Sequence, residues 1–342
     1  MSKSFSNEIL EIAPYRYAGT WLIGATTHAV DRFIADVERI FLPEQDHVGG
    51  TINFSLSGAP VEIGPTDPGS RKLRMKYRIR SPRSIDLGDK IFFDVRANSY
   101  FNWSHQVNFF LSLALAARSR VEAPITIILP GRMPQAAFDL YQQFGFEVVS
   151  TDGAISGRNF GWSVSHIEVV PSGRRQLISG FMSRHDDDAG VFPSFDLPAK
   201  VFLSRRGTRS LTNEAEIDHV LSARGFSKVY AEDLRVPEQF ALLRQADEVV
   251  AIHGAGLAPL QYRSLSRRPI RLIELAPAGI VTRWFGIMCE QVGGRYIAVR
   301  GRLKPEYVEG LYAAEPFEKY CDDNFHVDPK SLEVAFDMIG SD

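Results

Sequence analysis

The feature that most constrains this chain is a regular alternation of short apolar segments and amphipathic segments between residues 196 and 300. The apolar segments have the length of strands and are rich in Val, Ile and Leu. Strands that alternate with helices at such short intervals form a parallel sheet with helices on both faces. Right-handed crossovers then make this region Rossmann-like. The expected strands are 201–204, 228–231, 248–252, 270–275 and 295–299.

Helix signals occupy the intervals between those strands. Asn213 followed by Glu216 resembles a capping box, and Gly225 suits the position after a helix. Pro237 suits the first turn of a second helix, because its missing N–H costs nothing there. The further expected helices are 283–291 and 331–339.

The N-terminal half is less regular, yet it also mixes strand-like and helical segments. The short β-like runs before residue 85 do not show how they pair. After residue 85 the pattern is again that of an α/β protein. The expected strands are 90–95, 124–130 and 146–150, and the expected helices are 105–119 and 134–145.

The length of the chain agrees with a division into two domains. Its 342 residues are too many for one average domain and suit two. The segment 184–200 is charged and contains proline, which predicts a linker. We therefore expect an N-terminal α/β domain over residues 1–190 and a Rossmann-like domain over residues 191–342.

The charge and cysteine content exclude several classes of protein. A net charge of −2 indicates no nucleic-acid partner and no broad membrane footprint, so any anion site must use local arginines. Two cysteines are too few for a disulfide scaffold or a four-thiolate zinc site, and they fit a reducing compartment. The first ten residues hold no apolar signal core, so we expect a cytoplasmic protein.

Polar side chains gather where strands of the predicted sheet end. Ser204, Arg205 and Arg206 follow the first strand, and His253 follows the third. Ligands of open α/β sheets bind outside the carboxyl ends of the strands. Arginine forks bind the oxygens of a pyrophosphate in pairs. These residues are therefore candidates for an anion site.

A glycine-rich turn follows His253 and consists of Gly254, Ala255, Gly256 and Leu257. Glycine lets the backbone approach a ligand, and a helix after the turn would offer free N–H groups to phosphate. Glu274, near the end of the next strand, is placed to accept hydrogen bonds from a ribose. The alternative interpretation is a tight turn that binds no ligand, with the arginines solvated at the surface. Neither a G-x-G-x-x-G fingerprint nor a P-loop appears, which argues against a classical dehydrogenase or an NTPase.

The helical stretch 105–119 is apolar except for one polar stripe. His105, Asn108 and Ser112 lie on one face of this helix. Either that face is turned towards an interdomain cleft, or its polar groups have hydrogen-bond partners within the protein. His105 suits a general base because imidazole titrates near neutral pH. The histidines lack metal-ligand spacing, and the Asp-x-Asp sequence at 186–188 lies in the predicted linker. We therefore expect neither a metal nor another cofactor.

The C-terminal half resembles the glycosyltransferase family 61 domain. The matching motifs are Ser204-Arg205-Arg206, Asn213-Glu214, the segment from Tyr230 to Gln239, the segment from Ala246 to Leu257, and Ile273-Glu274-Leu275. The resemblance implies a GT-B-like enzyme, with two Rossmann-like domains that face each other across a cleft. It also implies inversion at the anomeric carbon, usually without a metal ion. The donor-binding residues that it implies are Ser204, Arg205, Arg206, Asn213, His253, Gly254, Ala255, Gly256, Leu257 and Glu274.

The resemblance is thinner in the N-terminal half. The family often shows the pattern N-[YF]-x-H-[WF]-x-x-[DE], to which Asn102 and His105 correspond. Our candidate for the catalytic base is His105, although another residue could take that role, and our candidates for the acceptor side are Asn102 and, from the polar stripe, Asn108. Phe109 stands where the family has an acid. That departure leaves open an altered acceptor or an inactive member.

The expected function is transfer of a hexosyl or pentosyl group from a nucleotide-sugar, most often UDP-linked in this family, to a saccharide or lipid-linked saccharide. Eukaryotic members of the family usually carry a secretory anchor, and we see none here, so we expect a bacterial enzyme of capsule, exopolysaccharide or lipopolysaccharide synthesis. We expect it in the cytoplasm, where it would act at the inner face of the membrane as a peripheral protein. The alternatives are a nucleotide-sugar epimerase of similar architecture and a non-catalytic nucleotide-sugar-binding protein.

Overall fold

The chain folds into two units that differ in the topology of their sheets. In the computed structural model, the first unit comprises Met1–Tyr15 and Val48–Val191, and the second comprises Arg16–His47 and Phe192–Asp342. The structure describes residues 7–12, 15–17, 19–25, 37–42, 45–47, 50–66, 82–96, 102–164, 193–264, 267–279, 284–302 and 320–340. The β-like run at 76–80 and most of the predicted linker lie outside these residues.

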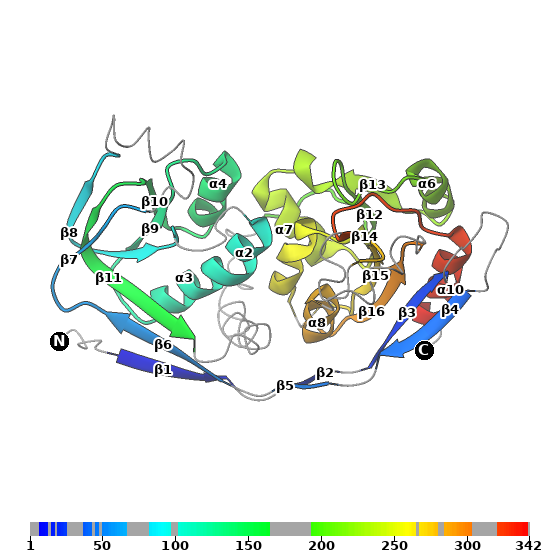
Figure 1. The fold of residues 1–342 in the computed structure, drawn as a ribbon, viewed down its shortest axis with the longest axis horizontal. Helices are drawn as coiled ribbons and strands as arrows, with labels where there is room; N and C mark the ends of the chain where they lie inside the picture. Colours follow the sequence, from blue (N-terminus) through cyan, green and yellow to red (C-terminus); the bar gives the residue numbers. More distant parts are fainter. Residues whose placement is uncertain are drawn as a thin grey trace. The chain divides into compact units, whose positions relative to one another are not determined.

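The second unit is built on a seven-stranded sheet in the order β13-β12-β14-β15-β16-β3-β4 (Figure 1). All pairs from β13 to β3 are parallel, and only β4 runs antiparallel to its neighbour. This is the Rossmann-like parallel sheet that the alternation of segments predicts. The strands are β3 (Thr20–Ala25), β4 (Val37–Leu42), β12 (Lys200–Ser204), β13 (Ser227–Tyr230), β14 (Glu248–Ile252), β15 (Arg271–Ala276) and β16 (Arg295–Arg300).

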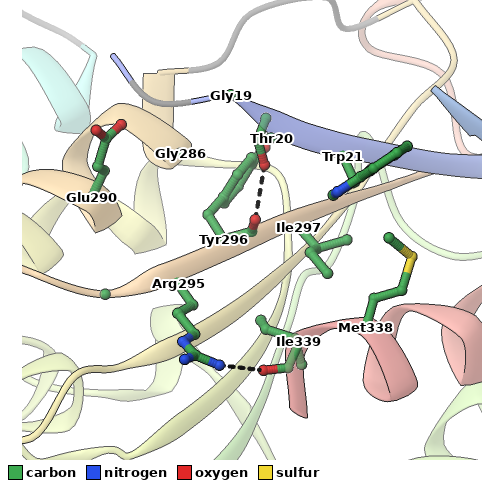
Figure 2. A pocket seen from close by; sticks show the side chains of 11 residues that line it. Gly19, Thr20, Trp21, Gly286, Glu290, Arg295, Tyr296, Ile297, Met338 and Ile339 are labelled. Atoms are coloured by element: carbon green, nitrogen blue, oxygen red, sulfur yellow. Dashed lines mark hydrogen bonds between the residues drawn. The ribbon is translucent and has the colours of Figure 1, made fainter. Parts of the chain in front are cut away.

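The strand β3 belongs to this sheet although it lies near the start of the chain. It pairs in parallel with β16, where Trp21 is opposite Ile297. Thr20 Oγ1 also donates a 2.8 Å hydrogen bond to the backbone carbonyl of Tyr296 (Figure 2). The N-terminal domain expected over residues 1–190 is therefore interrupted, because Arg16–His47 packs with the second unit.

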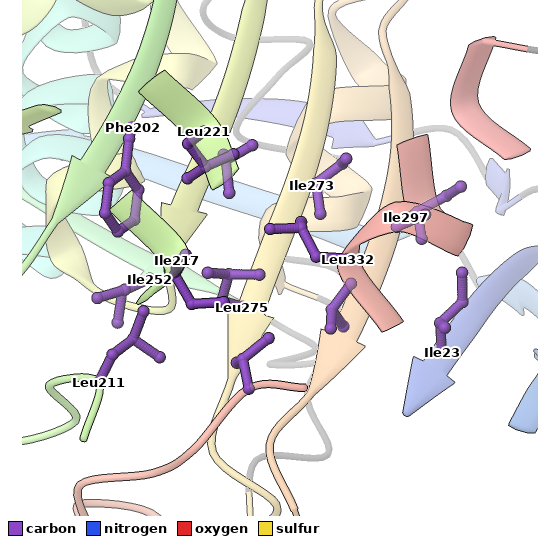
Figure 3. Packing of buried hydrophobic residues seen from close by; sticks show 14 of the residues in the cluster. Ile23, Phe202, Leu211, Ile217, Leu221, Ile252, Ile273, Leu275, Ile297 and Leu332 are labelled. Atoms are coloured by element: carbon purple, nitrogen blue, oxygen red, sulfur yellow. The ribbon is translucent and has the colours of Figure 1, made fainter. Parts of the chain in front are cut away.

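Two hydrophobic layers cover the faces of this sheet. Phe202, Ile273 and Ile23 pack on one face with α6 (Glu214–Ser222) and α10 (Pro329–Gly340), as Figure 3 shows. The residues that alternate with them pack on the other face. That face is covered by α7 (Val236–Gln245), α8 (Trp284–Gln291) and the 3-10 helix η4 (Ala255–Tyr262). Burial on both faces explains why these strands are almost continuously apolar.

The strand order of the second unit reverses at one place. From β12 the chain passes through α6 to β13 on one side, and then through the 3-10 turn η3 (Ala231–Asp233) and α7 to β14 on the other side. The carboxyl ends of β12 and β14 therefore lie at a topological switch point of the sheet. Open α/β sheets bind their ligands at such points.

The first unit has a mixed sheet in the order β1-β6-β11-β8-β9-β10, with β7 paired to β11. The strands from β11 to β10 are parallel, whereas β1, β6 and β7 pair antiparallel. Strands β2 (Tyr15–Tyr17) and β5 (Gln45–His47) form a separate two-stranded sheet. The remaining strands are β1 (Asn7–Ile12), β6 (Gly50–Leu56), β7 (Val61–Ile63), β8 (Ile85–Asp94), β9 (Ile125–Leu129), β10 (Glu147–Ser150) and β11 (Ile155–Val164).

The predicted helix 105–119 is present but irregular. It consists of α2 (Trp103–His105), a π-helical turn η1 (Gln106–Phe110) and α3 (Leu111–Arg118). The predicted helix 134–145 is α4 (Gln135–Gln143). The α/β fold class is thus confirmed, with one sheet in each unit, and it is consistent with two Rossmann-like domains of the GT-B-like kind. Among the described residues, no helix has both the length and the apolar content needed to cross a bilayer.

Candidate functional site

The two motifs at the switch point are in direct contact. Arg205 follows β12 and His253 follows β14, and these strands are hydrogen-bonded neighbours. Arg205 Nη1 donates to the backbone carbonyl of His253 at 3.3 Å, and Nη2 donates to Thr208 Oγ1 at 3.1 Å. Half-burial of the guanidinium lowers the pKa of Arg205, and the nearby Arg209 adds to the effect. The charge remains, because arginine titrates far above neutral pH.

Gly254 makes room for that arginine. A Cβ atom built at Gly254 would lie 2.7 Å from Arg205 Nη1, too close for two unbonded atoms. Its φ of 169° is extended backbone that any residue adopts, so the glycine provides space and not a special conformation. The guanidinium of Arg205 therefore occupies space that only glycine leaves free at position 254. This contact could not be predicted from the glycine motif.

Arg206 is held differently from its neighbour. Its two Nη atoms donate to the two Oδ atoms of Asp233, each at 2.7 Å, and its guanidinium lies 3.8 Å from the ring centre of Tyr230. The hydrogen bond to Asp233 raises the pKa of Arg206 and lowers that of Asp233. The arginine side chain is 54% exposed, so a ligand could reach it only by competing with Asp233.

Ser204 ends β12 inside a small hydrogen-bond network. Its Oγ donates to Glu214 Oε1 at 2.5 Å, and Tyr230 Oη donates to the same oxygen at 2.9 Å. Ser204 is buried, whereas Glu214 and Tyr230 are partly buried. Glu214 and Tyr230 fall within the motifs quoted above, but their types alone did not single them out.

Asn213 has a structural role that does not fit donor binding. Its Nδ2 donates to Glu216 Oε2 at 2.8 Å and to the carbonyl of Val327 at 2.7 Å. Its Oδ1 accepts the Val327 N–H at 3.1 Å. The amide thus links the C-terminal segment to the start of α6. The expected capping box is absent, because the Asn213 side chain accepts no hydrogen bond from an N–H of that helix.

Glu274 is buried beneath the switch point and has two partners. Its Oε1 lies 2.5 Å from His253 Nδ1, and its Oε2 accepts a 2.6 Å hydrogen bond from Tyr296 Oη. The glutamate side chain is only 1% exposed. A ribose contact, the role predicted for Glu274, does not fit this burial. Tyr296 was missed, since nothing in its sequence surroundings indicates a polar partner.

The turn after His253 leads into a 3-10 helix where an α-helix was a natural expectation. Pro259 lies inside η4, and Leu257 N donates to the carbonyl of Gly254. Leu257 is buried in the core, and Gly256 packs against Ala231. These residues can therefore meet a ligand mainly through the backbone of the half-buried Ala255 and Gly256, since Gly254 and Leu257 are buried.

The predicted residues of the first unit have unequal exposure. His105 is exposed on α2, whose start is capped by Asn102 Oδ1 through the backbone N–H groups of Ser104 and His105. Asn108 is buried, and its Nδ2 donates to Ser104 Oγ, so it does not fit an acceptor contact. Phe109, at the position of the family's acid, packs edge-on against Trp162 of β11 at 4.7 Å.

The described residues contain no group of three or more His, Cys, Asp or Glu side chains arranged to hold a metal. The Asp-x-Asp sequence at 186–188 lies outside them. Burial raises the pKa of the Cys289 thiol, so this cysteine is a core residue. A surface pocket lined by Thr20, Trp21 and Arg295 lies at the amino ends of β3 and β16, away from the strand ends that carry the motifs (Figure 2).

Comparison with known proteins decides the family. The family model described as Glycosyltransferase 61 matches residues 33–262, more than half of the chain. The chain belongs to glycosyltransferase family 61. This membership confirms the family that the sequence motifs indicate.

One relative of this family 61 glycosyltransferase is the beta-1,2-xylosyltransferase XAX1 of Oryza sativa subsp. japonica. The two are 29% identical over 143 residues, which cover 40% of this chain and 23% of the rice protein. Among solved structures, the chain aligns with the iron-containing dodecameric glycosyltransferase TibC from enterotoxigenic E. coli H10407. That alignment covers 81% of this chain and 77% of TibC, at 11% identity and a TM-score of 0.31. TibC in complex with ADP-D-beta-D-heptose aligns at 10% identity and a TM-score of 0.30.

Proposed function

We propose that this family 61 glycosyltransferase moves a sugar from a nucleotide-sugar to a hydroxyl group of a saccharide, with inversion at the anomeric carbon and without a metal ion. The observation that carries the proposal is the contact of Arg205 with the His253 carbonyl at the switch point of a parallel sheet. A half-buried guanidinium beside a glycine turn is suited to a diphosphate.

The proposed chemistry divides between the two units. The acceptor oxygen forms a bond to the anomeric carbon while the bond from that carbon to the diphosphate breaks. The hydroxyl proton passes to His105, which is exposed on α2. Arg205 stabilises the negative charge that develops on the leaving nucleoside diphosphate. Binding of the donor is thus assigned to the second unit, and deprotonation of the acceptor to the first.

The proposed substrates follow from the family and from the rice relative. We take a UDP-linked sugar as the donor, and the name of the rice relative makes a pentosyl group the first to test alongside hexosyl groups. The proposed acceptor is a saccharide or lipid-linked saccharide of a bacterial capsule, exopolysaccharide or lipopolysaccharide. The proposed setting is the cytoplasm at the inner face of the membrane, which cell fractionation would test.

The donor half is tested by measuring the melting temperature with a panel of nucleoside diphosphates and nucleotide-sugars, since a bound ligand stabilises the folded state. We expect UDP and at least one UDP-sugar to raise it. Transfer to a saccharide panel then tests the reaction, and His105→Ala should lower turnover by roughly 100-fold or more at unchanged UDP affinity. Conversion of the donor to an epimer without any acceptor would instead establish the epimerase.

A non-catalytic nucleotide-sugar-binding protein is the second candidate. The observation that favours it is the packing of Phe109 against Trp162 at the position of the family's acid. This candidate predicts donor binding without transfer or hydrolysis across the same acceptor panel. Turnover of any donor with any acceptor excludes it.

A further inference from the structure

The second unit holds a carboxylate in an apolar layer. Glu274 is on the face of β15 that also carries Leu272, which packs with Phe285 and Met288 of α8. Its register neighbours on the adjoining strands are Ala251 and Ala298, whose small side chains leave room for a longer one. Burying a carboxylate among apolar groups is costly unless it is paired, so its partners indicate why it is there.

The partners define which atoms carry protons. The phenol of Tyr296 donates to Glu274 Oε2, so this oxygen is an acceptor. The 2.5 Å separation of Glu274 Oε1 and His253 Nδ1 requires one proton between them, and an ionised carboxylate can only accept it. With Glu274 Oε1 as the acceptor, the imidazole carries its proton on Nδ1. Nε2, on the opposite edge of the ring, is the nitrogen left to meet a ligand.

The rest of the surroundings fix the same ring. The backbone N–H of His253 donates to the carbonyl of Leu275 at 2.8 Å, and the Phe285 ring lies edge-on 5.3 Å from the imidazole. Tyr296 itself is accommodated by Gly286 of α8, where an added Cβ would lie 2.7 Å from the tyrosine ring (Figure 2). Groups from two strands and a helix thus determine one orientation of His253.

We propose that Glu274 and Tyr296 are positioning residues, which hold His253 so that its Nε2 contacts the bound nucleotide-sugar. This inference rests on the proposed donor site, because His253 opens the glycine turn and its carbonyl accepts from Arg205. Glu274 acts through His253 and does not touch the donor. A well-packed apolar residue can often replace a buried charge without loss of stability. The buried carboxylate of Glu274 is therefore retained for function and not for stability.

The matched variants are Glu274→Gln, Tyr296→Phe and Glu248→Gln. The glutamine keeps the size of the side chain but lets its amide face Nδ1, which would favour the wrong tautomer. Tyr296→Phe removes one hydrogen bond and keeps the carboxylate. Glu248 lies at the amino end of β14 and pairs with Lys200 and Arg271, so its replacement is the control.

The first measurement is the nitrogen spectrum of ¹⁵N-histidine-labelled protein without ligand, with the His253 signals assigned through a His253→Gln sample. We expect a protonated Nδ1 with a strongly downfield proton, and loss of that signal in Glu274→Gln. Addition of UDP or a UDP-sugar should shift Nε2 more than Nδ1. An unprotonated Nδ1 in the wild type, or an Nε2 that ignores the bound nucleotide, would overturn the inference.

The second measurement is calorimetric affinity for the same nucleotide, together with the melting temperature. We expect Glu274→Gln to lose about tenfold or more in affinity, Tyr296→Phe about two- to fivefold, and Glu248→Gln nothing. The melting temperatures of the variants should change little. If Glu274→Gln or Tyr296→Phe folds and binds the nucleotide with unchanged affinity, Glu274 and Tyr296 have only a structural role. If the wild type binds no nucleotide at all, the proposed function fails, whereas the ligand-free spectrum still decides the Glu274–His253 bond.

Discussion

Arg205 and Arg206 are neighbours in the chain, yet their surroundings are different. Arg205 is half-buried and donates to a backbone carbonyl, whereas Arg206 is exposed and paired with Asp233. Within the described part of the chain, Arg205 donates hydrogen bonds to a backbone carbonyl and a hydroxyl and to no carboxylate, so its charge is available for an anion. Of the two, Arg205 is therefore the better candidate for the diphosphate.

We predict that Arg205→Ala weakens UDP binding by roughly 10- to 150-fold, because a charge-assisted hydrogen bond of about 1.5–3 kcal/mol is lost. Arg206→Ala should cost roughly fivefold at most, since its charge is already shared with Asp233 in water. Isothermal titration calorimetry measures both. A larger loss for Arg206→Ala than for Arg205→Ala would reverse the assignment.

The two glycines of the turn allow a similar comparison. A Cβ at Gly254 would meet the mobile end of Arg205, whereas a Cβ at Gly256 would lie 3.0 Å from the Cβ of Ala231 in packed structure. Gly254→Ala should reduce UDP affinity by about tenfold with little change in stability. Gly256→Ala should lower the free energy of unfolding by about 1–3 kcal/mol through overpacking. Urea denaturation and calorimetry separate the two effects, and equal behaviour would contradict both.

At the scale of the elements, α7 depends on a buried arginine. Arg263, at the end of η4, donates through Nη1 to the carbonyls of Leu243, Arg244 and Ala246, at 3.0, 3.0 and 2.7 Å. Helix ends leave such carbonyls without intrahelical partners. Burial lowers the pKa of Arg263, which remains a cation. One side chain thus completes the C-terminal end of α7.

We predict that Arg263→Met lowers the free energy of unfolding by about 2–4 kcal/mol, because several buried carbonyls lose their donor. Arg271→Met is the control, since Arg271 makes a surface pair with Glu248 and should cost under about 1 kcal/mol. Urea denaturation followed by circular dichroism gives both values. If the two variants lose similar amounts of unfolding free energy, Arg263 has no special role at the end of α7.

Elements that rest on local patterns could be predicted, and those that rest on distant partners could not. The strands β12, β14 and β15 are apolar runs between helix signals. Their predicted order therefore placed Arg205 and His253 at the same edge of the sheet. The local pattern around Glu274 did not show its hydrogen bond with Tyr296, 22 residues away. The local pattern around Asn213 likewise did not show its hydrogen bond with Val327, 114 residues away.

The same limit applies to the whole molecule. The apolar run at β3 was recognised as β-like, but its parallel partner β16 contacts it across 276 residues. Parallel pairing leaves no turn signal between the two strands, so the sequence did not show that Arg16–His47 belongs with the second unit.

We predict that Ile23→Ala destabilises the second unit by about 2–5 kcal/mol, because Ile23 is 0% exposed in the core of that sheet. Ile9→Ala in β1 should change stability by less than about 0.5 kcal/mol, since Ile9 is 63% exposed. Thermal unfolding with hydrogen exchange would show where the loss falls. Undiminished protection of β16 amides in Ile23→Ala would contradict the pairing.

The pairing of β3 with β16 also affects how the protein is made. Thr20 leaves the ribosome 276 residues before Tyr296, which at roughly 5–20 residues per second is a wait of roughly 15 to 55 s. Residues 48–191, which form most of the first unit, are synthesised during that interval. β4 can pair with one edge of β3 soon after synthesis, but the edge that β16 will occupy is open to wrong partners for all of that time. Nascent chains arrested before β16 should therefore be the state of this protein most dependent on chaperones.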